Sequence, residues 1–199
     1  LFHCKACNTG LSELQFIERV FDCSYAQARK LQLAFSTDET LVEWDNSVTL
    51  TEASKERALK LGISEEVIEE LKIRTPPPPF SQDLIAFPVF MYGHLIDIRT
   101  YNPGGTPKIR SRKDALTGLI IPFDLWHDTD LRKVTLICAG EKDMAIARSH
   151  GFNAITITGG ERALPIAITQ FKDRKVAICY DNDDTGRTGA IALANALLP

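Results

Sequence analysis

The sequence has no long hydrophobic run and no strong excess of charge of either sign. No apolar stretch approaches the roughly 20 residues that a helix needs to cross a membrane, so we do not expect a membrane protein. The 199 residues carry a formal net charge of −3. Such a balance is not that of a globally basic protein, so any contact with nucleic acid has to use a local basic patch.

Cysteine is also scarce: there are five, an odd number, and we expect a reduced, cytoplasmic setting. Cys138 and Cys179 lie inside apolar, strand-like runs, which favours buried free thiols in a reducing cytoplasm. The composition is 44% hydrophobic and 25% charged, as in ordinary globular domains. The sequence starts at Leu1 and stops soon after a helical pattern, so we expect a piece of a longer chain.

Residues 1–35 form the first unit. It begins with a hairpin-like knuckle that carries Cys4 and Cys7, the spacing of half a tetrahedral zinc site. Two short helical patterns follow, and Ser12 and Ser24 are suitable N-caps for them. We therefore expect a partial zinc ribbon followed by two helices.

Residues 36–79 combine a polar linker, a helical hairpin over 51–74 and a semi-rigid proline spacer. In the hairpin, Thr51 opens the first helix and Gly62 ends it. Ser64 then starts a second, short helix with a pattern resembling a capping box.

Residues 80–131 change to a β pattern and contain a run of basic residues. The expected strands of this small antiparallel unit are 85–90, 94–101, 108–110 and 119–123. Five cations and no acid occur between positions 99 and 113, namely Arg99, Lys108, Arg110, Arg112 and Lys113. Such a run is most often a solvated surface, but next to an acidic metal site it would hold phosphates.

Residues 132–199 alternate between strand and helix, which predicts a parallel sheet with right-handed crossovers. The expected strands are 134–138, 154–158 and 175–180, and the expected helices lie near 143–150, 161–171 and 186–198.

Acidic residues follow two of these strands. Asp143 comes shortly after the first strand, and Asp181 and Asp183 come directly after the last. Because the carboxyl ends of neighbouring parallel strands meet at one edge of a sheet, we expect these carboxylates to converge there. Hard oxygen ligands suit Mg²⁺ or Mn²⁺, and these ions suit phosphate chemistry. The plainer alternative is that an acidic turn only caps the following helix, with Asp184 and Thr185 in that role.

Together, the Gly140–Asp143 segment and the Asp181–Gly186 segment resemble the Toprim domain of primases, topoisomerases and some nucleases. In the primase branch the first motif reads Glu-Gly-x-x-Asp. Gly140 and Asp143 match it, whereas Ala139 stands where the glutamate, a metal ligand and candidate general base, is expected. Glu141 is a possible substitute, although it lies two residues further on.

The basic β unit and the cysteine knuckle extend this resemblance to bacterial and phage-type DNA primases. The resemblance implies a polymerase that makes short RNA primers from ribonucleoside triphosphates on single-stranded DNA, next to a fused or separate replicative helicase. Asp181, Asp183 and Asp143 would hold Mg²⁺ or Mn²⁺. A cluster of cations would hold nucleotide or template: Arg99, Lys108, Arg110, Arg112, Lys113 and Lys142. Cys4 and Cys7 would bind Zn²⁺ if the other half of the ribbon precedes Leu1.

The alanine at position 139 predicts a weak or inactive enzyme. A further acidic position of the family would lie past Pro199. Two other classes stay open: a Toprim nuclease or topoisomerase, and a non-catalytic module that binds nucleotide or DNA.

Overall fold

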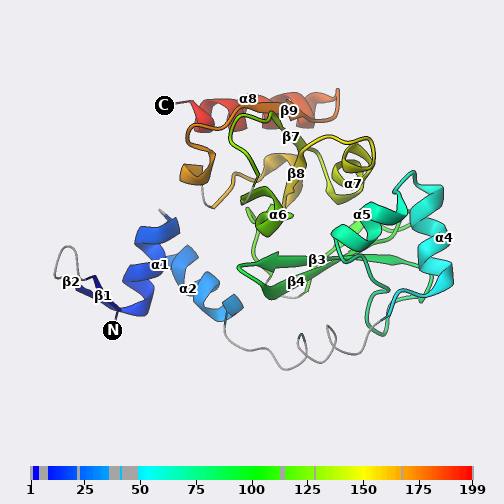
Figure 1. Ribbon diagram of the computed structural model, residues 1–199, viewed down its shortest axis with the longest axis horizontal. Coiled ribbons are helices and arrows are strands. Elements are labelled where there is room, and N and C mark those ends of the chain that lie inside the picture. Colours follow the sequence, from blue (N-terminus) through cyan, green and yellow to red (C-terminus); the bar gives the residue numbers. More distant parts are fainter. Residues whose placement is uncertain are drawn as a thin grey trace.

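Two β-sheets form the body of the protein, and helices flank both (Figure 1). The structure is a computed structural model that describes residues 2–4, 9–21, 23–35, 41, 49–112, 115–127, 129–166 and 168–198. The three-stranded sheet is antiparallel in the order β3-β4-β5, with strands Ile85–Met91, His94–Tyr101 and Ile109–Arg110. The four-stranded sheet has the order β6-β8-β7-β9, with β6 (Ile120–Ile121), β7 (Thr135–Cys138), β8 (Ala154–Ile157) and β9 (Val176–Cys179).

The N-terminal unit has the expected order of a hairpin and two helices. The elements are β1 (Phe2–Cys4), β2 (Thr9–Leu11), α1 (Glu13–Phe21) and α2 (Tyr25–Phe35). Ser12 accepts a hydrogen bond from the Gln15 amide at 3.2 Å, and the Gln15 side chain accepts one from the Ser12 amide at 2.9 Å. Ser24 and Gln27 repeat this reciprocal arrangement at α2. Both expected N-caps are therefore confirmed as capping boxes.

The helical hairpin is also confirmed, with α4 at Glu52–Lys60 and α5 at Glu65–Glu70. Thr51 caps α4, and Gly62 leaves the helix with a φ of 89°. Ser64 caps α5 by accepting from the Val67 amide. The buried hydroxyl of Ser54 donates to the Leu84 carbonyl at 2.6 Å, and this bond joins the hairpin to the start of β3.

The β3–β4 hairpin turns at Tyr92 and Gly93, where both φ angles are positive. Its register pairs Phe87 with Arg99 and Val89 with Asp97. Because side chains alternate along a strand, Asp97, Arg99 and Phe87 share one face of this sheet. That face carries the apolar core, so the two charged residues of β4 lie on the inward side.

In the four-stranded sheet, β7 pairs in parallel with both β8 and β9, as expected. The sheet as a whole is mixed, because β6 pairs antiparallel with β8. The expected strand over 119–123 therefore belongs to this sheet and not to the basic β unit. Cys138 is buried as expected, but Cys179 is exposed because β9 lies at the edge of the sheet.

The helices of this half are α6 (Phe123–His127), α7 (Glu141–Ser149) and α8 (Asp184–Leu197). The expected helix over 161–171 is wrong. Two short 3₁₀ turns, η1 (Gly160–Arg162) and η2 (Ile168–Phe171), stand there instead. Pro165 removes a helical donor and disfavours helix at the residue before it. The amide of Ile166 then bonds the Gly118 carbonyl at 2.8 Å, so this segment lies against the sheet edge.

A continuous apolar core joins the two sheets. Its buried members come from every layer and include Leu31, Ile68, Phe87, Met144 and Leu193. Within the part of the chain that the structure describes, no helix is both long and apolar enough to cross a membrane.

Candidate nucleotide and metal site

The two acidic segments leave the four-stranded sheet at the same edge. Strands β7 and β9 are parallel neighbours, and Cys138 is the register partner of Cys179. Ala139 and Tyr180 therefore follow at matching positions, with Gly140 and Asp181 next. The structure thus brings together the strand ends that the sequence predicted to converge.

Asp143 lies in the first turn of α7, and its Oδ1 is 2.9 Å from the Lys142 ammonium. This hydrogen bond, helped by the charges of Asp143, Tyr101 and Asp181, raises the pKa of Lys142 above its usual value. Lys142, predicted to bind nucleotide, therefore stays protonated.

Asp181 and Asp183 are both exposed at this edge. Asp183 is the N-cap of α8 and accepts from the Gly186 amide at 2.8 Å, so the capping role falls to it and not to Asp184 or Thr185. The cap uses only Oδ1 of this carboxylate and not Oδ2. The backbone of Asp181 is fixed separately, because its amide donates to the Glu161 side chain at 2.6 Å.

The donor set fits a hard cation only in part. Carboxylates at Asp143, Asp181 and Asp183 are suitable ligands for Mg²⁺ or Mn²⁺. The half-buried methyl group of Ala139 offers no donor at the end of β7. Among the residues with described positions, no group of three His, Cys, Asp or Glu side chains is arranged to hold a metal ion. Magnesium or manganese binding stays a prediction.

Only part of the cysteine knuckle falls within the described residues. Cys4 ends β1, whereas Cys7 lies outside the described residues. The hairpin is present as expected, and zinc binding at this half site stays a prediction.

The predicted basic residues occupy two different environments. Lys108, Arg110 and Arg112 are exposed on and beside β5, and Lys113 lies outside the described residues. Arg99 is only 6% exposed, and its guanidinium is bonded inside the protein. Its Nε donates to Glu141 Oε1 at 2.7 Å, and its Nη1 donates to the Ser111 hydroxyl. Arg99 therefore differs from Lys108 and Arg110, whose side chains are exposed to solvent.

Glu141 is itself 3% exposed, so its carboxylate is committed to Arg99 and is not open to solvent. The suggestion that Glu141 replaces the missing glutamate at 139 gains no support from this geometry. The sequence did not predict that Glu141 is the buried partner of Arg99, or that Asp97 is a buried acceptor for the Arg112 amide. The available signal was Asp97 and Arg99 spaced by two within the apolar strand 94–101, which places two charges on one inward face.

Asp97 is 1% exposed. Its Oδ1 accepts weakly from the Arg112 amide at 3.4 Å, and its buried Oδ2 has no hydrogen-bond partner in the described structure. Burial raises the pKa of Asp97 to about 6, although the bonds and charges of Ile98, Arg99 and Arg112 oppose this.

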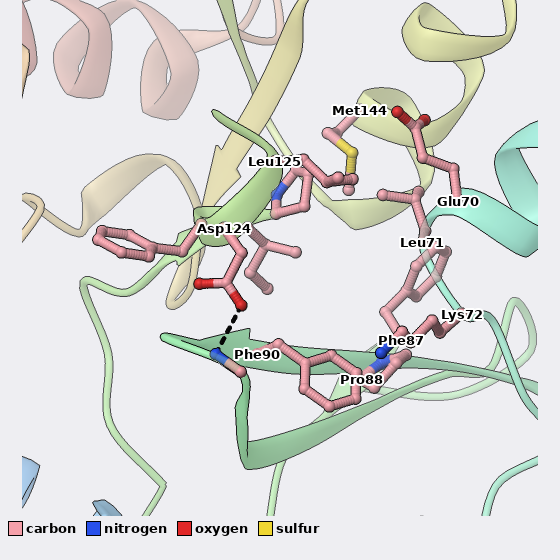
Figure 2. Close-up of a pocket in the computed structure, with 13 residues that line it drawn as sticks. Glu70, Leu71, Lys72, Phe87, Pro88, Phe90, Asp124, Leu125 and Met144 are labelled. Carbon is pink, nitrogen blue, oxygen red and sulfur yellow. Dashed lines mark hydrogen bonds between the residues drawn. The ribbon is translucent and has the colours of Figure 1, made fainter. Parts of the chain in front are cut away.

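A separate, almost wholly apolar pocket of about 210 Å³ lies where α5, β3, α6 and α7 meet (Figure 2). Figure 2 shows Asp124 beside it, bonded to the β3–β4 turn; the Gly93 amide donates to this carboxylate at 2.9 Å. No residue of the acidic edge lines the pocket, so it is not part of the candidate site. Its walls are formed mainly by Leu71, Phe87, Pro88, Phe90, Ile121, Pro122, Phe123, Leu125 and Met144.

No protein-family model and no curated protein matches this sequence. Several solved structures do match. The zinc-binding and RNA polymerase domains of the Aquifex aeolicus primase superpose with a TM-score of 0.65 at 18% identity, over 98% of this chain. The DnaG primase catalytic domain bound to single-stranded DNA gives 0.65 at 19% identity over 86% of the chain. The primase fragment of the bacteriophage T7 primase-helicase gives 0.54 at 14% identity over 70%.

The chain has the fold of a primase catalytic core. This confirms the resemblance that the acidic motifs indicated and gives both sheets a counterpart in the matched proteins. The chain spans 64% of the length of the Aquifex primase chain, 68% of the DnaG chain and 60% of the T7 fragment.

Proposed function

We propose that this chain is part of a DNA-dependent primase that joins ribonucleotides on a single-stranded DNA template. The observation that carries the proposal is the adjacency of the β7 and β9 ends, which places the Gly140–Asp143 and Asp181–Asp183 segments side by side. This arrangement occurs within a fold shared with primase catalytic domains, one of which was solved bound to single-stranded DNA.

In the proposed reaction, the 3′-hydroxyl oxygen of one nucleotide attacks the α-phosphorus of the next and pyrophosphate leaves. Bound Mg²⁺ or Mn²⁺ would neutralise the phosphate charge and align the displacement. Asp181 and Asp183 are the proposed main ligands, with Asp143 as a further ligand or an orienting group. The exposure of Asp181 and Asp183 at the sheet edge keeps these two carboxylates accessible to a triphosphate.

The exposed cations beside β5 are the proposed phosphate contacts. Lys108 and Arg110 flank Ile109 and are both exposed, as expected for residues that alternate along a strand. The protonated Lys142 adds a positive charge nearer the acidic edge. Contacts of this kind hold template or triphosphate irrespective of base sequence.

Ala139 is the specific observation that favours a second candidate, a non-catalytic Toprim module that binds nucleotide or DNA. A methyl group neither ligates a metal nor accepts a proton. We therefore propose that the native chain has little primase activity. Zinc at Cys4 and Cys7, and a fused or separate replicative helicase as partner, are further parts of this proposal.

The test is Ala139→Glu in the full-length protein, supplied with single-stranded DNA, labelled ribonucleotides and Mg²⁺ or Mn²⁺. We expect oligoribonucleotide synthesis to rise roughly 100-fold or more over the native protein, because a metal-binding carboxylate is regained. Asp181→Asn in the same background is the control and should remove the gain. Nucleotide binding without synthesis in both proteins supports the non-catalytic module, and template cleavage supports a nuclease.

A further inference from the structure

Next to the candidate site, a buried ion pair joins the three-stranded sheet to the helix that follows β7. Arg99 belongs to β4 of the three-stranded sheet, and Glu141 is the first residue of α7, directly after the Gly140 N-cap. Their Nε and Oε1 atoms are 2.7 Å apart, and the two residues are 6% and 3% exposed. The contact therefore connects the basic β unit to the segment that carries Lys142 and Asp143.

A second nitrogen of the Arg99 guanidinium contacts residues 108–112, which we call the basic segment. Its Nη1 donates to the Ser111 hydroxyl, one residue after Arg110. Two positions before Arg99 on the same face, Asp97 accepts from the Arg112 amide at 3.4 Å. The inward charges of β4 thus hold residues 111 and 112, while the β4–β5 ladder holds Arg110 opposite Thr100.

A gain in stability does not by itself explain why a protein would have a buried ion pair at this place. Removing two charges from water is costly, and a well-packed apolar pair of similar volume is often as stable. What an apolar pair lacks is direction, because a guanidinium fork fixes two acceptors in one plane. Here the two acceptors belong to α7 and to the basic segment. One side chain therefore sets their mutual position.

We propose that Arg99 and Glu141 are positioning residues that fix the basic segment 108–112 relative to the acidic edge of the four-stranded sheet. For its effect on primer synthesis, this inference rests on the proposed function. The positioning itself is independent of that function and can be measured without it.

The main test is the double variant Arg99→Met/Glu141→Met, which replaces the ion pair by an apolar pair. We expect a melting temperature close to that of the native chain, together with amide hydrogen exchange at 108–112 that is roughly tenfold faster. In the Ala139→Glu background, the same change should raise the KM for ribonucleotides roughly tenfold. A merely structural pair would move the melting temperature and leave local exchange unchanged.

The control is Arg148→Met/Glu70→Met, which removes the ion pair between the last turn of α7 and α5. Exchange at 108–112 should stay at the native rate in this variant, because the pair does not touch the basic segment. If the Arg99/Glu141 double variant fails to fold, Arg99→Lys replaces it. Lysine keeps the charge but cannot bridge both acceptors, so exchange at 108–112 should still accelerate.

Native exchange rates at 108–112 in a folded double variant, or in Arg99→Lys, overturn the proposal. Absence of primer synthesis in every Ala139→Glu protein defeats only the proposed function, since the exchange measurement still decides the positioning role.

Discussion

At the scale of single residues, Asp97 is a charged side chain in an unfavourable environment. It is almost completely buried, one carboxylate oxygen has no hydrogen-bond partner, and the nearby charges of Arg99 and Arg112 do not offset its desolvation. A buried, under-satisfied carboxylate favours its protonated form. Stability should therefore depend on pH through this one group.

We predict that Asp97→Asn weakens the pH dependence of stability. Burial raises the pKa of Asp97 from its ordinary 3.8 to about 6 in the folded state. The folded protein thus holds a proton that the unfolded chain has lost, so the free energy of unfolding falls as pH rises from about 4 to about 6. The loss is on the order of 3 kcal/mol above pH 6, and Asp97→Asn should not show it. Urea titrations at several pH values measure both curves.

Asp130→Asn is the matched control. Hydrogen bonds from Arg132 lower the pKa of this exposed carboxyl, so its removal should change the pH dependence in the opposite direction. A difference between native protein and Asp97→Asn that stays constant from pH 4 to 7 would contradict the titration of Asp97.

At the scale of elements, the first turns of α8 pack closely against the backbone of Glu161 and Asp181. A Cβ atom added at Gly189 would lie 2.0 Å from the Glu161 carbonyl oxygen, and one at Gly186 would lie 2.0 Å from the Asp181 carbonyl oxygen. The two glycines therefore let α8 approach η1 and the loop 181–183 that precedes the helix. This approach places Glu161 where it can accept from the Asp181 amide.

We predict that Gly189→Ala destabilises the protein by about 1–3 kcal/mol, because backbone atoms must shift to admit the methyl group. The sign of the change in stability is informative, because replacing glycine by alanine in a helix interior normally stabilises the helix by about 1 kcal/mol. Thr188→Ala on the exposed side of α8 is the control and should stabilise slightly. Thermal melts of the two variants compare them, and a Gly189→Ala protein more stable than native would show that α8 is not closely seated.

The elements that were predictable are those whose signals are local. The caps at Ser12, Ser24, Thr51 and Ser64 lie within three residues of the groups they satisfy, so sequence reasoning found them. The error over 161–171 came from reading helical periodicity across Pro165. Such misses arise where a local pattern competes with a distant partner.

The same division holds for the candidate site. Convergence of the two acidic strand ends follows from alternating strands and helices, which is a topological rule. The partner of Arg99 is 42 positions away in sequence, and nothing local distinguishes an arginine that binds phosphate from one that meets a buried glutamate. The strand over 119–123 was assigned to the wrong sheet for the same reason, since its partner is β8.

At the scale of the whole molecule, the two sheets share one core. The buried cluster runs without a break from the α5 hairpin through β3 to α7 and the four-stranded sheet. The apolar pocket of Figure 2 interrupts the packing at this junction, but Phe87, Phe123 and Met144 around it all belong to the cluster. The sheets should therefore depend on each other for stability.

We predict that both sheets unfold in a single transition, because separating them would expose the shared core. Trp126 reports on the four-stranded sheet: it is fully buried, and its indole donates to Thr135 of β7 at 3.2 Å. With Trp44→Phe, which leaves Trp126 as the sole tryptophan, its fluorescence should change at the same urea concentration at which the amides of β3 and β4 lose exchange protection. Exchange of the β3–β4 amides well before the fluorescence change would mean that the three-stranded sheet opens by itself. In that case the Arg99–Glu141 pair would break in the first step, since it joins β4 of the three-stranded sheet to α7.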